Sequence, residues 1–228
     1  MDAAENSVRY AKTARPVPVN VLARERLYKL LDEARSRPVV WIAGPPGAGK
    51  TTLVADYLVH RPIDTIWYQV DGSDADPASF FYFVSQAVQE RHPDSRPLPL
   101  LASEFSADLE VFTRRFFREL FNRLHTPFAL VLDNFQDGAQ AAGLLSILQT
   151  GLSEIPPGGN IILVARIEPP AVLARFRANN QMCVVGWDEL RLTREEQDGI
   201  VALRGMHYDD AALSTLYRRT QGWAVALA

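Results

Sequence analysis

Apolar residues along the chain form two kinds of run, and these predict strands and helices in alternation. Short continuous runs bounded by glycine, proline or polar residues are typical of buried strands. They lie at 38–44, 64–70, 128–133, 161–166 and 181–185. Between them, apolar side chains recur at helical spacing, as Leu53, Val54 and Leu58 do in the run from Lys50 to about His60. Strands that alternate with helices in this way predict a parallel sheet covered by helices on both faces.

Polar residues mark where several of these helices begin. Asp76 and Pro77 suit the cap and the first position of a helix. We expect Ser106 to cap a longer helix before the third strand. Thr193 and Glu196 have the spacing of a capping box.

The same pattern divides the chain into three parts. Residues 1–20 are polar, contain two prolines and predict an extended lead-in. Residues 21–186 carry all the predicted strands, whereas 187–228 contain helices only and predict a second, smaller unit. The last residues, GWAVALA, have the apolar pattern of a helix that starts there and is cut short, so we expect the chain to be a fragment.

Composition and charge narrow the possible function classes. The chain has 228 residues, 47% of them hydrophobic, and a formal net charge of −3, so no overall basic field draws it onto DNA or a membrane. No apolar run approaches the ~18 residues that span a bilayer, and the first residues lack the apolar core of a signal peptide. The single cysteine, Cys183, cannot pair within the chain, which fits a reducing compartment. We therefore expect a cytoplasmic protein with no membrane partner.

Two sets of side chains are of types that can bind metals or anions, but we interpret both as structural or surface residues. Four histidines lie far apart without metal-ligand spacing, and we interpret them as structural or surface residues: His60, His92, His125 and His207. Four arginines decorate the helix predicted before the third strand, and we interpret them as a solvated face: Arg114, Arg115, Arg118 and Arg123.

One segment carries a phosphate-binding motif in full. The residues GPPGAGKTT at 44–52 match G-x-x-x-x-G-K-[ST], and they follow an apolar strand and open a helix, as the motif requires. The predicted cradle consists of Gly44, Pro45, Pro46, Gly47, Ala48, Gly49, Lys50, Thr51 and Thr52. A glycine-rich turn without a ligand is the alternative, but the complete match in its context favours a nucleotide site.

The chemistry explains each part of this motif. Glycines let the backbone turn tightly so that N–H groups point at phosphate oxygens, and the helix start adds its positive dipole end. We expect Lys50 to reach the β- and γ-phosphates and the Thr51 hydroxyl to join the coordination shell of Mg²⁺. Thr52 supports the cradle through its hydroxyl or simply packs. The predicted ligands are ATP or ADP with Mg²⁺.

The run FALVLDNFQDG at 128–138 supplies the expected metal strand. Asp133 ends the apolar run, and we predict that it holds the Mg²⁺ shell through water. At least one strand and two helices lie between Lys50 and Asp133, which is typical of ATPases with an inserted strand. In such ATPases a second acid often follows the metal aspartate and polarises water, but here that position is Asn134.

The amide at Asn134 makes slow hydrolysis the expectation. An amide orients water but cannot take its proton, and general-base assistance is typically worth ~10²–10⁴ in rate. Positioning and Mg²⁺ electrostatics would remain. Asp137 is an alternative base, although it lies beyond the strand, and Asn134 can also be purely structural.

Arginines near the next strand are the remaining candidates. Arg166 ends the predicted strand IILVAR, where its guanidinium can meet the γ-phosphate and report its presence. The alternative is an arginine at a strand exit into solvent. Arg175 and Arg177 could act as fingers on a neighbouring molecule, but we interpret them as surface residues.

With these motifs in order, the chain resembles the nucleotide-binding module of STAND-class signalling ATPases, in particular the maltose-activator-like group of large ATP-binding LuxR-type regulators. The resemblance runs from about Lys12 to the last residue. Its segments are AKTARPVPVNVLARERLYKLLD, GPPGAGKTTL, IWYQVDGSDADPASFFYFVSQAV, LVLDNFQD, LVARIEPP, DELRLTREE and, as a Thr-x-Gly-Trp signature, TQGWAVALA. Two positions depart from it, since many relatives have an aromatic residue at Ala48 and usually a second acid at Asn134.

The resemblance implies a fold and a mode of action. The fold is an α/β P-loop NTPase at 21–186 with a parallel sheet of order 5-1-4-3-2, followed by a partial helical lid at 187–228. Arg24, in the R-x-R-L helix, is expected near the adenine. ADP would hold a resting form, while ATP with an inducer would favour a form that self-associates. Inducer and DNA would bind only through regions outside these residues.

Two other function classes remain open. An AAA+-like ATPase that acts on nucleic acid would share the inserted strand, but the sequence offers neither a convincing arginine finger nor a basic stripe. A P-loop kinase for a small molecule is the other alternative. The inserted strand and the lid signature speak against it.

Overall fold

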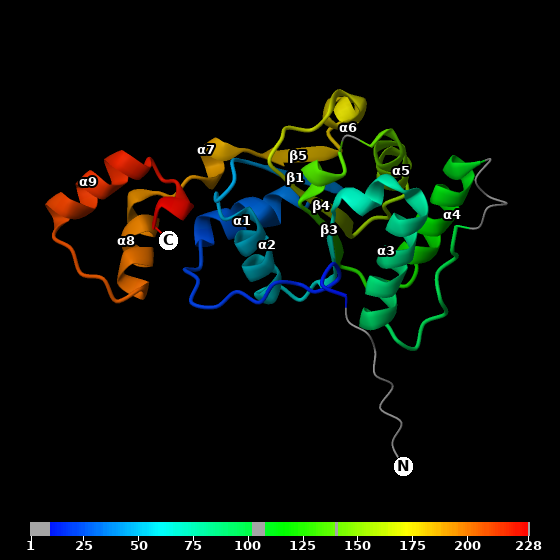
Figure 1. Cartoon of the computed structure of the whole chain (residues 1–228), viewed down its shortest axis with the longest axis horizontal. Helices are drawn as coiled ribbons and strands as arrows, with labels where there is room; N and C mark the ends of the chain where they lie inside the picture. Colours follow the sequence, from blue (N-terminus) through cyan, green and yellow to red (C-terminus); the bar gives the residue numbers. More distant parts are fainter. Residues whose placement is uncertain (1–9, 102–107, 140, 228) are drawn as a thin grey trace, which may run out of the picture.

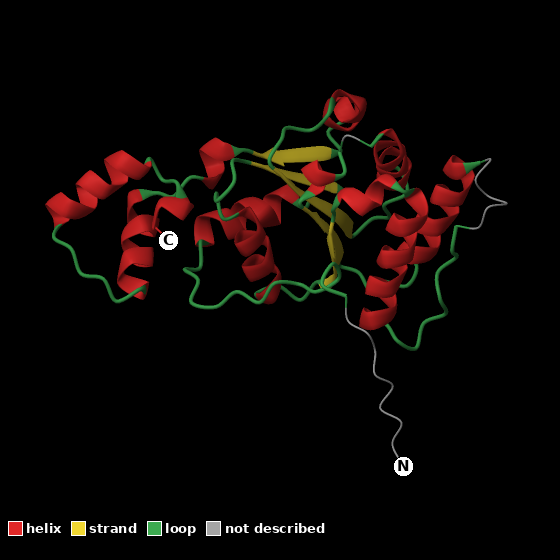
Figure 2. Cartoon of the chain, in the orientation of Figure 1, coloured by secondary structure: helices red, strands yellow, loops and turns green. Residues whose placement is uncertain are grey.

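A five-stranded parallel sheet forms the centre of the protein in this computed structural model, which describes residues 10–101, 108–139 and 141–227 (Figures 1 and 2). The strands are β1 (Val39–Ala43), β2 (Asp64–Gln69), β3 (Phe128–Asp133), β4 (Gly159–Ala165) and β5 (Met182–Val185). Their order across the sheet is β2-β3-β4-β1-β5. Read from the other edge this is the predicted 5-1-4-3-2, so the predicted fold class is confirmed.

The inner strands are buried along their whole length. Every residue of β1, β3 and β4 is buried, because each strand has a neighbour on both sides and helices on both faces. Their side chains point alternately to the two faces. Val40 and Ile42 belong to the apolar cluster on one face, and Val39 and Trp41 to the cluster on the other. A sheet covered on both faces explains why these strands are continuous apolar runs.

Helices cover the sheet on both faces. The helices α1 (Glu25–Ala34) and α2 (Lys50–Val59) bury their apolar sides in one cluster. The helices α3 (Pro77–Arg91), α4 (Leu109–Phe121) and α5 (Ala142–Leu152) contribute to the other. This part of the chain also contains shorter helical segments: η1 (Gly72–Ala75), η3 (Phe135–Asp137), η4 (Ala171–Leu173) and α6 (Ala174–Ala178).

After β5 the chain is helical, as predicted. It forms α7 (Trp187–Leu190), α8 (Arg194–Leu203), α9 (Asp210–Thr220) and η5 (Ala224–Leu227). The capping box predicted for Thr193 and Glu196 starts α8. Figure 1 shows α8 and α9 at the opposite end of the molecule from α3 and α4, with the chain then turning back toward the sheet. None of the helices in the described ranges is long and apolar enough to cross a bilayer.

The structure corrects some predicted element boundaries. Asp76 caps α3 with Pro77 in its first turn, as expected, but the described cap of α4 is Asp108, and Ser106 lies outside the described residues. The strand predicted to start at 161 begins earlier, because β4 starts at Gly159, which pairs with Phe128. The strand ends at Ala165, so Arg166 lies just beyond it.

Candidate functional site

The motif residues converge at the carboxyl end of the sheet. The P-loop follows β1, Asp133 is the last residue of β3, and Arg166 follows β4. Because parallel strands end at the same edge, residues distant in sequence meet there. The hydroxyl of Thr51, in the first turn of α2, lies 3.0 and 3.1 Å from the two carboxylate oxygens of Asp133 and donates to them.

The backbone of the P-loop depends on two glycines in left-handed conformations. Gly47 has φ +74° and Gly49 has φ +80°, values that residues with a Cβ rarely adopt. Gly49 is also the cap of α2, so the loop leads directly into the positive end of that helix. Successive free N–H groups at a helix start form the kind of cradle that binds phosphate.

Lys50 is buried beside this loop with neutral partners only. Its side chain donates to the carbonyl oxygens of Gly44 (2.7 Å) and Pro45 (3.0 Å), and within the described part of the chain no carboxylate lies at ion-pair distance from it. Burial and then the positive charge of Arg166 lower the pKa of Lys50 below its ordinary value, while Asp133 opposes the shift. A buried ammonium without a paired anion is costly, so the site fits an anionic ligand such as a phosphate chain.

Asp133 is the acidic counterpart of Lys50. Burial raises the pKa of its carboxyl group, while hydrogen bonds from the backbone of Asn134 and from Thr51 and the charge of Lys50 oppose the rise. The Thr51 hydroxyl and the Asp133 carboxylate are hard oxygen donors, which is the chemistry that Mg²⁺ prefers. These two residues fit a divalent cation bound beside phosphates.

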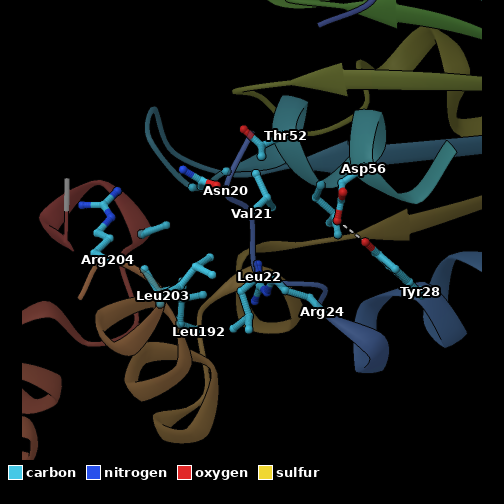
Figure 3. Close-up of a pocket in the computed structure, with 15 residues that line it drawn as sticks. Asn20, Val21, Leu22, Arg24, Tyr28, Thr52, Asp56, Leu192, Leu203 and Arg204 are labelled. Carbon is cyan, nitrogen blue, oxygen red and sulfur yellow. Dashed lines mark hydrogen bonds between the residues drawn. The ribbon is translucent and has the colours of Figure 1, made fainter. Parts of the chain in front are cut away.

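Two cavities meet at the start of α2 and together have the layout of a nucleotide site. The phosphate cavity, about 240 Å³, contains Lys50, Asp133 and Arg166 among its lining residues. The nucleoside cavity, about 200 Å³, is lined by Arg24, Thr52 and Leu192 among other residues (Figure 3). Gly49 and Thr52 line both, so the two volumes are adjoining.

The nucleoside cavity is formed by segments from both parts of the chain. Its apolar lining comes from the segment before α1, from the P-loop and α2, and from the lid: Val21, Leu22, Ala48, Leu53, Leu192, Ile200 and Leu203. Tyr28 and Asp56 close one end, where the tyrosine hydroxyl donates to the carboxylate (Figure 3). Apolar walls with a few polar groups suit a flat base attached to a polar sugar.

Arg24 lines this cavity, but its guanidinium is engaged with the lid. Its Nη2 donates to the carbonyl of Leu190 at 2.7 Å and to the Glu196 carboxylate at 2.8 Å. With its side chain only 9% exposed, it joins the start of α1 to the start of α8. The position of Arg24 near the base stays a prediction, and the structure adds its contacts to the lid.

The residues after Asp133 differ in their relation to the phosphate cavity. Asn134 lines it and has a left-handed backbone (φ 54°), which asparagine tolerates better than most residues. Asp137, the alternative base, is exposed and is not among the lining residues. Gln136 lines the cavity instead, and its Oε1 accepts a 3.0 Å hydrogen bond from the backbone N–H of Arg166. No motif marks Gln136 in the sequence, because it is the turn η3 that brings it back to the site.

The segment before the C-terminus contacts the P-loop directly. The indole Nε1 of Trp223 donates to the carbonyl of Pro46, and the backbone N–H of Val225 donates to the carbonyl of Gly47 at 3.0 Å. A Cβ on Gly47 would lie 2.5 Å from that of Val225. The predicted Thr-x-Gly-Trp signature is thus in contact with the phosphate cradle.

At the far end of the sheet the structure corrects the interpretation of two histidines as distant from each other. The rings of His92 and His125 lie 5.4 Å apart, and both approach the carboxylate of Asp64 at the amino end of β2. Sequence spacing could not reveal this, because the three residues belong to three different segments.

Comparisons with known proteins agree with this geometry. Residues 33–168, more than half of the chain, match the family model of the AAA domain. The HTH-type transcriptional regulator MalT of Vibrio cholerae serotype O1 is 27% identical over 220 residues, which cover 91% of this chain and 23% of the regulator. The regulator of the same name from Serratia proteamaculans is 28% identical over 223 residues, covering 95% and 24%. The chain thus spans about a quarter of the length of these relatives.

Solved structures share the fold. The STAND protein with a tetratricopeptide repeat sensor from Pyrococcus horikoshii has a TM-score of 0.61 at 19% identity, covering 96% of this chain and 31% of that one. The Walker-type ATPase of Pyrococcus abyssi has a TM-score of 0.55 at 15% identity, covering 96% and 68%. The resemblance predicted from the motifs, to a STAND-class P-loop ATPase module, is confirmed.

Proposed function

The chain belongs to the AAA domain family, and we propose that it is the nucleotide-binding switch module of a transcriptional regulator. In this proposal bound ATP or ADP sets the arrangement of the lid, and slow Mg²⁺-dependent hydrolysis resets it. The similarity to two MalT regulators supports the regulatory role. Inducer and DNA would bind to other regions of a longer, cytoplasmic protein.

The observation that carries the proposal is the contact between the lid and the P-loop. Trp223 and Val225 bond to the carbonyls of Pro46 and Gly47, so any rearrangement of the loop around phosphates acts on the lid directly. The nucleoside cavity also has lid residues in one wall, among them Leu192. A ligand that touches both parts shifts their equilibrium by its difference in affinity for the two arrangements.

We assign the site residues as follows. Lys50 and the P-loop backbone bind the phosphates, and Thr51 and Asp133 hold the magnesium ion. Mg²⁺, when bound, would neutralise charge on the phosphate oxygens. Arg166 stands at the cavity wall and is the candidate detector of the γ-phosphate. The base site lies between the P-loop domain and the lid, with Arg24 joining the two.

Hydrolysis by this site would be slow for lack of a base. Asn134 and Gln136 carry the amides that line the phosphate cavity, and amides orient water without accepting its proton. A module whose output is its bound state has no need of rapid turnover.

We further propose limits for the parts of this chain. The P-loop domain would be residues 21–186, the partial lid 187–228 and the lead-in 1–20. Arg24 and the segment from Trp223 to Val225 would connect the lid to the P-loop domain at two separate points.

No observation favours the nucleic-acid alternative. The three arginines of α4 and Arg123 just after it all have acidic partners, since Arg114 and Arg118 pair with Glu154 while Arg115 and Arg123 pair with Glu119. Their charges are therefore locally balanced rather than presented as a basic stripe.

The switch is tested by identifying and exchanging the nucleotide. Purified protein is denatured and the released nucleotide identified, and the sedimentation of the protein is then compared with ADP and with ATP. Retained ADP, and self-association in ATP only, are the expected results. Sedimentation that is identical with both nucleotides, despite saturated binding, would refute the switch and leave only a nucleotide-binding domain.

A further inference from the structure

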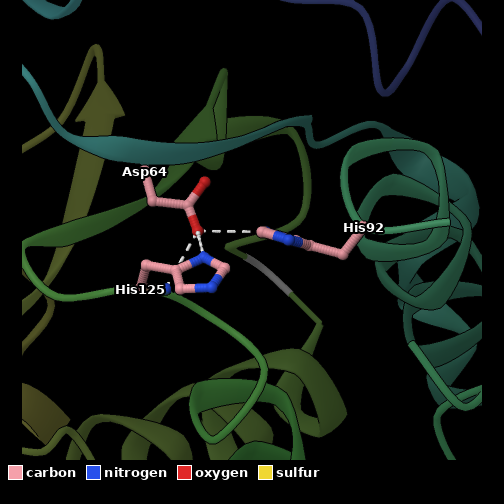
Figure 4. Close-up of side chains that lie close together, drawn as sticks. All are labelled: Asp64, His92 and His125. Atoms are coloured by element: carbon pink, nitrogen blue, oxygen red, sulfur yellow. Dashed lines mark hydrogen bonds and ion pairs between the residues drawn. The ribbon is translucent and has the colours of Figure 1, made fainter. Parts of the chain in front are cut away.

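Three side chains with metal-binding atoms meet at the amino end of the sheet, opposite the nucleotide site (Figure 4). Asp64 is the first residue of β2, His92 follows the last residue of α3, and His125 lies in the connection before β3. The sheet places them together, because Asp64 pairs with Phe128 and its N–H donates to the carbonyl of Pro127.

The distances within this cluster match those around a tetrahedral ion. The Nε2 of His92 lies 3.0 Å from Oδ2 of Asp64, and the Nδ1 of His125 lies 3.4 Å from the same oxygen. All three ligand atoms lie within 4.8 Å of one another. Bonds of ~2.0–2.2 Å at tetrahedral angles place ligand atoms about 3.3–3.6 Å apart. Small shifts of the side chains would therefore admit a metal ion.

The hydrogen bonding of the cluster is incomplete without such an ion. The Asp64 side chain is only 8% exposed and that of His92 only 14%. Oδ1 of Asp64 and Nε2 of His92 lie at ion-pair distance from Arg91 and from Oδ2 of Asp64, but neither makes a hydrogen bond of acceptable geometry. Buried polar atoms in this condition are uncommon and call for an explanation. The backbone N–H of His125 donates to Oδ2 of Asp64 at 3.0 Å, and this bond orients the carboxylate.

We propose that Asp64, His92 and His125 bind one transition-metal ion of the zinc class. Two imidazole nitrogens and one carboxylate oxygen are ligands that zinc accepts, whereas Mg²⁺ prefers oxygen alone. His125 is 82% exposed, so water reaches the remaining position. The ion would join the end of α3 and the connection before β3 to the start of β2. This site is independent of the nucleotide site.

Arg91 should lower the affinity of this site for a metal ion. Its Nε lies 3.2 Å from Oδ1 of Asp64, and its positive charge opposes a second cation. The side chain is 57% exposed and can turn toward solvent, which weakens this repulsion. We therefore expect micromolar rather than nanomolar binding of Zn²⁺.

The test is a calorimetric titration of the whole chain with Zn²⁺ in excess Mg²⁺, which occupies oxygen-only sites. We expect one Zn²⁺ per chain for the wild type, and affinity reduced about tenfold or more in His125→Ala. His125 is exposed, so its removal should leave folding and nucleotide binding intact. His207→Ala removes another exposed histidine and is the matched control, expected to bind as the wild type does.

Two further readouts decide between a metal site and a cluster held by ion pairs alone. Co²⁺ should give the intense visible bands of tetrahedral coordination with wild type and His207→Ala but not with His125→Ala. Zn²⁺ at 100 times its dissociation constant should raise the melting temperature of the wild type by about 5–10 °C. No binding by the wild type, or equal affinity in wild type and His125→Ala, would overturn the proposal.

Discussion

The indole Nε1 of Trp223 donates a 2.9 Å hydrogen bond to the carbonyl oxygen of Pro46, joining the lid to the phosphate loop across most of the chain. The adjacent bond from Val225 to Gly47 makes this a two-point contact. The loop that binds phosphate thus also holds the lid.

We expect Trp223→Phe to change the relative affinity for ADP and ATP. The variant keeps an aromatic ring but loses an N–H donor, and a hydrogen bond of this kind is worth about 0.5–1.5 kcal/mol. The ratio of the two dissociation constants, measured by calorimetry, should therefore shift about 2–10-fold. Trp187→Phe, at the start of α7, is the control. If the ratio of the ADP and ATP dissociation constants equals the wild-type ratio in both variants, Trp223 has no part in the switch.

Lys50→Ala should remove most of the affinity for nucleotide. In the wild type, ATP with Mg²⁺ at 100 times its dissociation constant should stabilise the fold by ~2.7 kcal/mol, a melting shift of roughly 5–10 °C. The variant should show almost none of this shift. Lys29→Ala, an exposed lysine on α1, should retain it. Binding of wild-type strength in Lys50→Ala would contradict the assignment of the phosphate cradle.

Asn134→Asp should speed single-turnover hydrolysis of ATP. Aspartate tolerates the left-handed backbone at this position and can take a proton, so the rate should rise by up to about 10²-fold. Asn134→Gly keeps the backbone and removes the amide, and it should hydrolyse more slowly than the wild type. An unchanged rate in Asn134→Asp would leave Asn134 with a structural role only.

Gln136→Ala should slow hydrolysis, whereas Asp137→Ala should not. Gln136 lines the phosphate cavity and accepts from the backbone of Arg166, while Asp137 is exposed. We expect about a tenfold loss in single-turnover rate for the first variant, the smaller end of what a positioned side chain contributes. The reverse ranking of the two variants would restore Asp137 as the candidate base.

Asp133→Asn should stabilise the nucleotide-free protein at neutral pH. Burial raises the pKa of this carboxyl group, so the folded protein binds its proton more tightly than the unfolded chain does. Its contribution to stability is present below the ordinary value of 3.8 and is lost as pH rises through the raised value. Asparagine avoids that loss, and we expect a gain of about 0.5–2 kcal/mol in the free energy of unfolding.

Urea unfolding at several pH values measures this difference. It should shrink as the pH falls through the raised value and below 3.8, where both states bind the proton. A less stable Asp133→Asn at neutral pH would mean that the hydrogen bonds of the carboxylate outweigh its burial.

Much of this architecture is readable from the sequence because local signals agree with one another. Continuous apolar runs at 38–44 and 128–133 are typical of strands with neighbours on both sides. The residue types of the P-loop motif favour one backbone conformation. The sheet order is what the resemblance to STAND-class ATPases implies, and the inserted strand between Lys50 and Asp133 agrees with it. These features depend on periodicity and on residue types with narrow conformational preferences.

Other features depend on tertiary structure and leave no local signal. Gln136 reaches the phosphate cavity because of one short turn, and Asp64 meets His92 and His125 because parallel strands align their starting ends. Arg24 pairs with Glu196, a residue far along the chain. Such contacts join separate segments, so neither spacing nor composition reports them.

The strand order has a consequence for how the protein is made. Among the strands that the structure describes, β1, which leads into the P-loop, pairs with β4 and β5, and its first residue, Val39, pairs with Ile161 and Met182. During synthesis from the N-terminus, more than half of the chain must therefore be made before this apolar strand can pair with β4. Contacts between such distant residues form slowly, and unpaired apolar strands attract other chains meanwhile. The nucleotide site is encoded early in the chain and assembled late, so the nascent protein is most exposed to aggregation before it can bind its ligand.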